Sequence, residues 1–452
     1  MTHLLSTLAS QLEPFRASHN RLVLGLSGGL DSRVLLQLLA TLRDTQRHNN
    51  VLPEWEIQAI HVHHGLSENA DVWAQQCKAW CEALSIEFVC EKVTVEFGSR
   101  LSLEQQARDA RYQALAQYID KRTLLLTGHH ADDQFETFLL ALKRGSGPKG
   151  LSSMAMSRIF HDGVLLRPLL GCDRNELYDY ATSLELEWVE DESNTDTRFD
   201  RNFLRHDIIP SIKQRWPQVT QQVIKSTALC AEQEQLLTEL LTPIYQHCLH
   251  NDALLIAPLL EQSCLTQKRL VRMWFAERGR LMPSQKILNQ ILNQVLSAKA
   301  DATPIVELEN GQLRRFQNAL YIVDSLPELS DWQQPLPLET WVELPAQQGT
   351  IGVFSDDTLI EDHCFWVGNI SDSSDLSGLT VSYNSAGLKA KPVGRSGSRK
   401  LKKLWQEYSV PPWLRQRYPI VLQQLTVIAV AGLFTDQRFC GTGYKVMWKK
   451  EH

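Results

Sequence analysis

A short loop near the start of the chain has the composition of an anion-binding site. It reads Ser27-Gly28-Gly29-Leu30-Asp31-Ser32 and follows an apolar run at 22–26 that is typical of a buried strand. Because glycine lacks a Cβ atom, the backbone can turn sharply here and a ligand can approach its N–H groups. A helical pattern with one apolar face begins at Asp31. These features predict a phosphate site at a helix N-terminus.

A group of histidines and carboxylates follows a second apolar run, at 124–127. Its members are His129, His130, Asp132, Asp133 and Glu136. Asp132 and Glu136 are four residues apart and would share one face of a helix. Carboxylates near a helix N-terminus often only offset the helix dipole. Three of them beside two histidines exceed what capping requires, which makes the group a candidate catalytic site.

Several arginines have spacings that suit an anionic ligand. Arg108 and Arg111 are three residues apart, with Glu104 on the same helix face. A surface ion pair would explain Glu104 and Arg108, but two adjacent arginines also suit a phosphate, and both readings stay open. Arg144 opens a basic, glycine-rich stretch that fits phosphate or RNA, although Gly145 could equally be a helix C-cap.

A polar loop at 190–205 is long and mixed in charge, and its last residues Arg201, Asn202 and Arg205 open the next helix. The length of this loop favours a functional role over a solvated surface.

Three histidines could be mistaken for a metal cluster. In a strand at 55–65, His61 and His63 would point to one side and His64 to the other. We therefore expect His63, His64 and Gly65 to line a nucleotide pocket at the carboxyl end of the strand, where nucleotides bind in open α/β sheets. Cys77 and Cys81 have helical spacing, which favours core packing over metal binding.

A basic block near the C-terminus contrasts with the net charge of −6. It contains no acidic residue and six basic ones, which are Lys391, Arg395, Arg399, Lys400, Lys402 and Lys403. The stretch that follows adds Trp405, Trp413, Arg415 and Arg417. Clustered positive charge next to tryptophans predicts a polyanion partner, with nucleic acid preferred over a merely solvated surface.

The order of the elements indicates the fold class. Apolar runs for strands are at 22–26, 55–65, 87–95, 124–127 and 165–170, with helices between them. Strand–loop–helix units in succession predict an α/β fold with a doubly wound parallel sheet. Helical spacing continues from 219 to 295 and ends in a strand-like segment at 312–323. The last hundred residues have short strand patterns, which predict a small α+β domain.

The expected domains are 1–215 for the catalytic sheet, 216–326 for a helical middle domain after a long linker helix, and 346–452 for an α+β domain that binds RNA. Four prolines mark 327–345 as a linker. There is no apolar stretch of eighteen residues and no basic start of a signal peptide. Nine cysteines without a Cys-x-x-Cys spacing favour reduced thiols, so we expect a cytoplasmic protein without a membrane span.

The glycine loop lacks the lysine of a P-loop and the spacing of a dinucleotide-binding turn. It resembles the pyrophosphate loop of the N-type ATP pyrophosphatases. The chain as a whole resembles the bacterial tRNA(Ile)-lysidine synthetase family. The resemblance rests on Ser27–Ser32, His61–Leu66, Glu104–Tyr112, His129–Thr137, Arg144–Leu151, Asp191–Asn194 with Arg201, Asn202 and Arg205, and Gly394–Lys403. Ser67 departs from the family pattern, where many relatives have a basic residue.

The resemblance implies an adenine nucleotide alpha hydrolase-like fold and a ligase reaction. ATP would adenylate the C2 oxygen of the wobble cytidine in a tRNA(Ile) with a CAU anticodon, and the amine of free lysine would displace AMP. Residues 27–32, His63 and Gly65 would bind ATP, and Asp31 would hold Mg²⁺. Asp132, Asp133 and Glu136 would bind lysine and guide loss of its proton, because its amine is charged at neutral pH with a pKa of about 10.4.

The resemblance also implies a role for the basic side chains. Phosphates of ATP or tRNA would be bound by Arg108, Arg111, Arg144, Arg201, Arg205 and the basic residues of the C-terminal block. No obligate protein partner is evident, and a homodimer stays open. Two alternatives share part of the pattern. A tRNA thiolation enzyme would have the same ATP loop but usually needs paired cysteines. A non-catalytic tRNA-binding protein would need neither Asp31 nor the carboxylate group.

Overall fold

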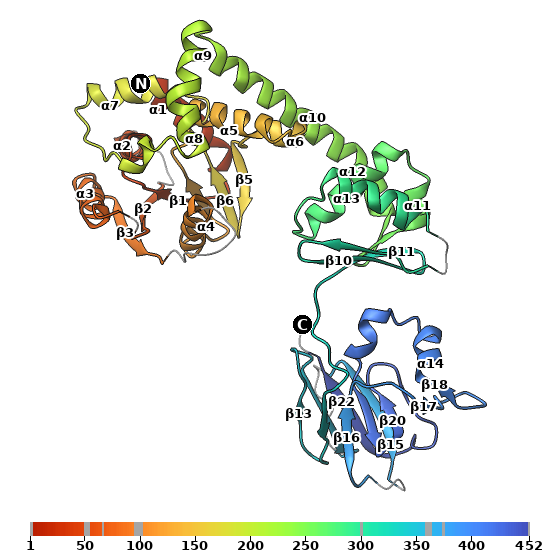
Figure 1. Ribbon diagram of the computed structural model, residues 1–452. Coiled ribbons are helices and arrows are strands. Elements are labelled where there is room, and N and C mark those ends of the chain that lie inside the picture. Colours follow the sequence, from red (N-terminus) through yellow and green to blue (C-terminus); the bar gives the residue numbers. More distant parts are fainter. Residues whose placement is uncertain are drawn as a thin grey trace. The chain divides into compact units, whose positions relative to one another are not determined.

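The structure is a computed structural model that describes residues 3–48, 55–65, 67–94, 103–298, 302–357, 364–372 and 376–450. The expected helix cap at Ser102 and the side chain of Glu104 lie outside these described parts. The chain divides into two compact units, 1–240 and 241–452 (Figure 1). No helix in the described part of the chain is long and apolar enough to cross a membrane.

Unit 1 is built on a six-stranded sheet with the order β3-β2-β1-β4-β6-β5 (Figure 1). All neighbouring strands are parallel except the β5–β6 pair, which is antiparallel. The strands are β1 Arg21–Gly25, β2 Glu56–His63, β3 Glu87–Lys92, β4 Thr123–Leu126, β5 Ser157–Phe160 and β6 Gly163–Leu166. The predicted doubly wound parallel sheet is therefore confirmed.

Both faces of this sheet are covered by helices because alternate residues of the inner strands are apolar on both sides. In β1, Leu22 and Leu24 join the core formed with α1 and α2, whereas Val23 packs with Leu115 of α4. The helices and helical turns are α1 His3–Leu12, η1 Glu13–Phe15, α2 Leu30–His48, α3 Ala70–Ala83, α4 Leu103–Ala116, α5 Ala131–Lys143, α6 Pro148–Leu151, α7 Arg174–Ser183, η2 Glu192–Thr195, α8 Asp200–Phe203, η3 Leu204–Ile208, α9 Ile209–Arg215 and α10 Val219–His247.

The fifth predicted strand, at 165–170, is wrong in its limits. The strand β6 ends at Leu166, and Pro168 just beyond it has no N–H to continue the ladder. Leu169 and Leu170 are buried in a turn rather than in a strand. The partner β5 was not predicted, because its exposed Ser–Arg–Ile sequence has no apolar run.

The middle part of unit 2 combines helices with a sheet. The helices are α11 Ile256–Leu260, α12 Cys264–Glu277, α13 Gln285–Gln290 and η4 Ile291–Leu296. They pack on a sheet of order β7-β8-β11-β10-β9, with β7 Leu249–His250, β8 Ala253–Leu255, β9 Ile305–Leu308, β10 Gly311–Phe316 and β11 Ala319–Val323. The strand-like segment predicted at 312–323 is thus a hairpin, which turns at Gln317 with a φ of 52°.

The C-terminal part of unit 2 is mainly antiparallel sheet. Two sheets have the orders β12-β16-β19-β20-β21 and β13-β14-β22-β15. The strands are β12 Gln333–Pro335, β13 Val342–Glu343, β14 Thr350–Ser355, β15 Trp366–Ser371, β16 Leu379–Ser382, β17 Lys389–Ala390, β18 Arg399–Lys400, β19 Ile420–Gln423, β20 Thr426–Val430, β21 Phe434–Thr435 and β22 Gly443–Lys449, with helical segments α14 Leu401–Glu407 and η5 Pro412–Arg417.

The segment predicted as a linker, 327–345, contributes β12 and β13 to these sheets. Its prolines end short edge strands, where a missing N–H is tolerated, while Leu336 and Leu344 are buried in the core. The C-terminal sheets therefore begin before residue 346. The other domain limits stay a prediction.

Candidate active site

The glycine loop joins β1 to α2 in a conformation that requires glycine. Gly28 has a φ of 89°, and a Cβ atom there would lie 3.1 Å from the sulfur of Cys77. The hydroxyl of Ser32 fastens the loop, because its Oγ accepts the N–H of Gly28 at 3.2 Å and donates to the carbonyl of Gly29 at 3.0 Å. The loop is thus held open at the first turn of α2, where helix N–H groups can face an anion.

Two other segments close tightly around this loop. The N–H of Val189 donates to the carbonyl of Gly28 at 2.9 Å. Gly128, after β4, is so near the start of α2 that an added Cβ would lie 2.9 Å from the backbone N of Ser32. A side chain at position 128 would push the two segments apart, so glycine is required here by close approach.

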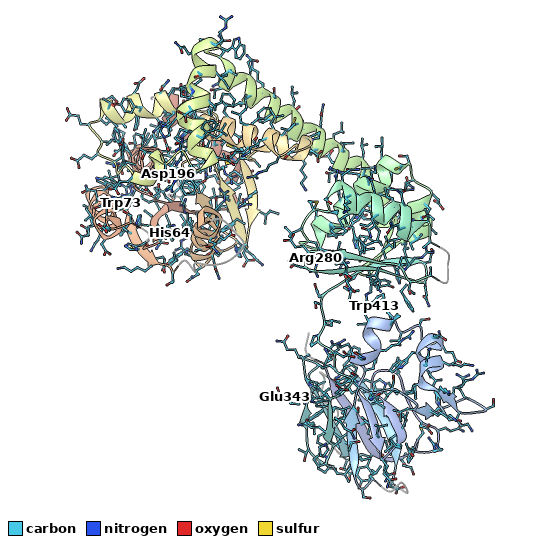
Figure 2. The ribbon with its side chains drawn as sticks, in the orientation of Figure 1. His64, Trp73, Asp196, Arg280, Glu343 and Trp413 are labelled. Atoms are coloured by element: carbon cyan, nitrogen blue, oxygen red, sulfur yellow. The ribbon has the colours of Figure 1, made fainter. Side chains whose placement is uncertain are left out.

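A cavity of about 880 Å³ opens beside the loop at the carboxyl ends of β1, β2 and β4. This volume is in the range of small-molecule sites. Its lining includes Ser27, Asp31 and Ser32 of the loop, His63, His64 and Gly65 after β2, Trp73 of α3, Arg111 and Tyr112 of α4, His129 and Asp133, and Phe199, Arg201, Asn202 and Arg205. Figure 2 shows His64 and Trp73 from these walls. The structure thus brings together segments that are far apart in the sequence.

A buried ion cluster forms one end of the cavity. Glu136 is 1% exposed and accepts hydrogen bonds from the Nε atoms of Arg201 and Arg205, each at 2.7 Å. Arg205 also reaches Oδ1 of Asp133 at 3.3 Å. Burial lowers the pKa of these arginines, but the carboxylates more than offset it, so both pKa values are raised. Asp133, Arg201 and Arg205 line the cavity, whereas Glu136 lies behind them.

His130 links this cluster to the glycine loop. Its Nε2 lies 3.5 Å from Oδ2 of Asp31 and 3.6 Å from Oδ2 of Asp133. Burial lowers the pKa of His130, but the negative charges of Asp133 and Asp31 outweigh the effect of burial and raise this pKa to about 9. We assign the proton of the neutral ring to Nε2, because Nδ1 accepts the N–H of Asp132 at 3.2 Å. If Nδ1 also takes up a proton, it can no longer accept the N–H of Asp132. The charged ring is then attracted to the carboxylates of Asp31 and Asp133.

Asp133 is ionised under all ordinary conditions. Burial raises its pKa, but His130 and Arg201 more than compensate and lower it to about 2. Asp133 also caps α5, since its Oδ2 accepts the N–H of His130 at 3.1 Å. Its charge is therefore fixed in place at the cavity wall.

Asp132 does not belong to this cluster, which corrects the expectation that the three carboxylates act together. Its Oδ1 accepts from Nζ of Lys213 at 2.5 Å, and it does not line the cavity. Adjacent helix residues point about 100° apart, so Asp132 and Asp133 face different neighbours. The pair with shared partners is Asp133 and Glu136, not Asp132 and Glu136.

Asp31 has the features of a ligand for Mg²⁺. Its Oδ1 is buried and has no hydrogen-bond partner among the described residues, and the side chain lines the cavity at the start of α2. Mg²⁺ at nucleotide sites is commonly held by one or two carboxylates together with phosphate oxygens. In the described part of the chain, no group of three or more His, Cys, Asp and Glu side chains could hold a metal without such a substrate.

The four cavity histidines differ in their surroundings. His61 is buried, its Nδ1 bonds the carbonyl of Leu26 at 2.9 Å, and burial lowers its pKa, so it supports the loop. His63 lies 3.2 Å from Asp71. Burial lowers the pKa of both His64 and His129 to about 4, which keeps them neutral. Within the described part of the chain, neither ring nitrogen of His64 has a hydrogen-bond partner, so His64 can hydrogen-bond a ligand in the cavity.

The predicted arginines separate into cavity and surface residues. Arg111 lines the cavity and is exposed there. Arg108 instead lies over the ring of Tyr112, 5.4 Å from its centroid, outside the cavity lining. Arg144 is exposed at the C-cap of α5, also outside the lining. Of the two interpretations of this stretch, the end of a helix therefore describes the structure at this end of α5.

The loop at 190–205 forms a wall of the cavity. Asn69 donates to Oε1 of Glu192 at 2.8 Å, which ties the loop to the start of α3. Asn202 donates to the carbonyl of Asp196 at 2.9 Å, and Arg198 forms a bidentate pair with the same aspartate. Figure 2 shows Asp196 in this loop. The α3 wall was not predicted, because Asn69 and Trp73 carry no spacing that distinguishes them from an ordinary helix start.

The basic block belongs to unit 2, where it folds as β17, β18 and α14, whereas the cavity belongs to unit 1. Arg399, Lys400, Lys402 and Lys403 are exposed, while Arg395 pairs with Glu407. Trp405 is only 2% exposed in the core, and Arg417 is buried, so the expectation that they contribute to a polyanion surface is wrong. The helical spacing of Trp405 with Leu401 and Leu404 marks it as a core residue.

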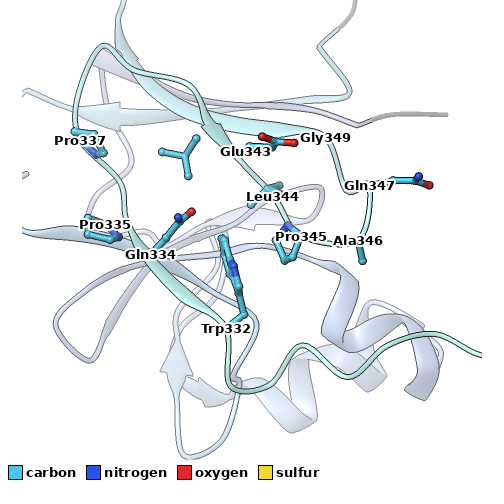
Figure 3. A pocket seen from close by; sticks show the side chains of 11 residues that line it. Trp332, Gln334, Pro335, Pro337, Glu343, Leu344, Pro345, Ala346, Gln347 and Gly349 are labelled. Carbon is cyan, nitrogen blue, oxygen red and sulfur yellow. The ribbon is translucent and has the colours of Figure 1, made fainter.

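A second hollow, of about 690 Å³, lies in the C-terminal part (Figure 3). Prolines, glutamines and Trp332 dominate its wall, and Glu343 is the one ionisable residue among the described residues that line it. It therefore lacks the paired acids, bases and cations that the larger cavity has.

Three family models match the chain. They are described as a PP-loop domain at residues 2–212, a TilS substrate binding domain at 254–321 and a TilS substrate C-terminal domain at 379–450. A tRNA(Ile)-lysidine synthase of Vibrio vulnificus strain CMCP6 is 48% identical over 451 residues and covers 100% of both chains. The synthase of Vibrio campbellii is 46% identical over 456 residues, again with 100% of both covered.

Among solved structures, the U34-tRNA thiolase NcsA of Methanococcus maripaludis matches with a TM-score of 0.42 at 18% identity. The match covers 51% of this chain and 78% of the thiolase chain. The relatives of nearly half identity extend over the whole length, and the residues that line the cavity fall within the match to the PP-loop domain. From its glycine loop to its C-terminal sheets, the chain belongs to the tRNA(Ile)-lysidine synthase family.

Proposed function

We propose that this protein uses ATP to join free L-lysine to C2 of the wobble cytidine in a tRNA(Ile) with a CAU anticodon, which forms lysidine. The observation that carries the proposal is one cavity shared by a phosphate loop and a fixed carboxylate, in a chain of this family. The phosphate loop suits activation of the base, and the carboxylate suits binding of an amine. The product would read the codon AUA in place of AUG.

In the first step, the C2 oxygen of cytidine attacks the α-phosphorus of ATP and pyrophosphate leaves. The N–H groups at the start of α2 and the loop from Ser27 to Ser32 hold the phosphates. Arg111 and the arginines of the buried cluster add positive charge at the cavity wall. His63, His64 and Gly65, after β2, contact the nucleotide at the carboxyl end of the sheet.

Mg²⁺ would be held by Asp31, whose unpartnered Oδ1 faces the cavity, together with phosphate oxygens. When bound, the ion offsets the charge that develops on the phosphates. His130 orients this carboxylate from the other side, because it contacts Asp31 through Oδ2.

In the second step, the ε-amine of lysine attacks C2, the C2–O bond breaks and the oxygen leaves with AMP. Asp133 is the carboxylate best placed to bind the lysine ammonium, since it lines the cavity, whereas Glu136 and Asp132 are outside the lining. Its pKa of about 2 means that it orients the amine and does not keep its proton. The proton leaves to solvent as the amine becomes nucleophilic.

The tRNA body is bound by basic side chains of unit 2. The exposed Arg399, Lys400, Lys402 and Lys403 suit contacts to backbone phosphates, which give affinity but no sequence information. The substrates are a tRNA, ATP and free lysine, which meet in the cytoplasm, so we place the enzyme there.

The direct test is incubation with ATP, Mg²⁺, radiolabelled lysine and tRNA(Ile) with a CAU anticodon. We expect label fixed to RNA, with one AMP and one pyrophosphate released per lysidine. Controls lack ATP, or contain an initiator tRNA(Met), or use the variant Asp31→Asn, and each should leave the RNA unlabelled. RNA binding without any ATP-dependent labelling would instead support a non-catalytic tRNA-binding protein.

A further inference from the structure

The proposed reaction has a steric requirement for the RNA base. The C2 oxygen of cytidine has to reach the α-phosphorus, so the base must leave the anticodon stack and enter the cavity. Proteins hold such an extruded base by stacking it on an aromatic side chain and by hydrogen bonds to its edges. A search for the stacking residue therefore begins with the aromatic rings of the cavity wall.

Three large aromatic side chains line the cavity within the described residues, and they are Trp73, Tyr112 and Phe199. The ring of Tyr112 is already occupied. Arg108 lies 5.4 Å and Arg158 5.6 Å from its centroid, and Phe160 packs on it at 5.6 Å. A base could not stack on this ring without displacing an arginine.

Phe199 is free to accept a base. Its side chain is 39% exposed although it lines the cavity, and it belongs to none of the hydrophobic core clusters of the described residues. In the described part of the chain, no ring or guanidinium group stacks on it. An exposed phenylalanine at a cavity wall loses the benefit of burial, which a stacked base would restore.

The backbone holds Phe199 in a defined position. Its N–H donates to the carbonyl of Asp196 at 3.3 Å, and its own carbonyl accepts the N–H of Phe203 at 3.0 Å. The next residue, Asp200, pairs with Lys143 at 2.6 Å. These contacts fix the backbone at the start of α8, so less order has to be gained there when a base binds.

The residues next to Phe199 make it a better candidate for the stacking residue than Trp73. Arg201 and Asn202 follow on the same short helix and line the same cavity, and Arg201 is paired with the buried Glu136. Phe199 is thus attached to the element that also carries the ion cluster around Asp133. Trp73 belongs to α3, which contributes no residue to that cluster. A base on Phe199 would lie beside the groups that we assign to the lysine step.

We propose that Phe199 is the stacking platform for the extruded wobble cytosine. This role rests on the proposed function and adds to it the residue that receives the base. It requires an aromatic ring at position 199 but no hydroxyl and no charge.

The test compares Phe199→Leu and Phe199→Tyr with two control variants. Phe203→Leu removes an equally exposed aromatic ring, 43% exposed, four residues further on and outside the cavity lining. Trp73→Leu removes the remaining large aromatic side chain of the cavity wall, among the described residues. Each full-length variant is assayed for ATP binding, for single-turnover lysidine formation and for fluorescence of tRNA(Ile) with pyrrolocytidine at the wobble position, which stacking quenches.

We expect Phe199→Leu to bind ATP like the wild type but to form lysidine about 5- to 150-fold more slowly, the range for loss of one base–aromatic stack. Quenching of pyrrolocytidine should be lost in this variant and kept in Phe199→Tyr and Phe203→Leu.

The inference would be overturned if Phe199→Leu formed lysidine and quenched pyrrolocytidine like the wild type. It would also be overturned if only Trp73→Leu lost lysidine formation and quenching. If the wild type itself forms no lysidine, the proposed function fails, which is a different result.

Discussion

Two groups of positive charge in this molecule are organised in opposite ways. In unit 1, Arg201 and Arg205 are paired with Glu136 and Asp133, in a cluster that joins segments 65 to 72 residues apart. In unit 2, Lys400, Lys402 and Lys403 are neighbours in the sequence and exposed to solvent. The same kind of side chain therefore serves a fixed internal geometry in one place and an adaptable surface in the other.

The difference predicts how each group responds to change. A buried ion pair is little affected by salt, but loss of one partner leaves a charge without compensation. Exposed cations act almost independently, and salt weakens each contact to a polyanion. Four variants test this contrast, and they follow in order of expected effect.

The largest effect is expected for Glu136→Gln. This change keeps the shape of the side chain but removes the charge that Arg201 and Arg205 share. Loss of one partner from a buried pair costs about 3–5 kcal/mol. We expect a lower thermal unfolding midpoint of unit 1 and no lysidine formation, both insensitive to salt. An unchanged midpoint would show that the cluster does not stabilise the fold.

A smaller, pH-dependent effect is expected for His130→Asn. Asparagine retains the helix cap but cannot be protonated. The pKa of His130 is raised from 6.5 to about 9 in the folded protein, so its charge stabilises the fold fully below about pH 6.5 and no longer above pH 9. The wild type should therefore unfold at a higher temperature than the variant at pH 6, and this difference should shrink towards pH 9. A difference that is constant over this range would contradict the link between His130 and the two aspartates.

The third effect concerns the surface group. Lys400, Lys402 and Lys403 changed together to alanine should weaken tRNA binding most at low salt, and should reduce the slope of log K against log salt by about 2 to 3. Filter binding at several salt concentrations measures this slope. ATP binding should stay unchanged, because these residues are not part of the cavity. Equal slopes for variant and wild type would remove the block from the RNA interface.

The smallest effect is expected for Arg198→Gln. Arg198 forms a short bidentate pair with Asp196, yet its side chain is 88% exposed, so water and salt screen the attraction. The unfolding midpoint should not change measurably, which makes the variant a control for Glu136→Gln. A loss comparable to that of Glu136→Gln would mean that geometry, and not burial, decides the strength of these pairs.

Local sequence was sufficient for the glycine turn and for the parallel strands of the first sheet with the helices between them. The glycines after a short apolar strand predicted the turn now seen at Gly28, because backbone freedom and helix polarity act within a few residues. The basic surface of the C-terminal domain was also predicted for its lysines, since exposed charges need no partner elsewhere in the chain.

Only the tertiary structure decided which of these groups meet. The sequence could not tell that Asp133 faces the cavity while Asp132 pairs with Lys213, nor that Glu136 fixes two arginines from a distant helix. It also could not separate the buried Trp405 from a nucleic-acid contact, or reveal Phe199 at the cavity wall. The physical reason is that burial and charge pairing depend on neighbours supplied by other segments, which are set by packing of the whole fold and not by spacing along the chain.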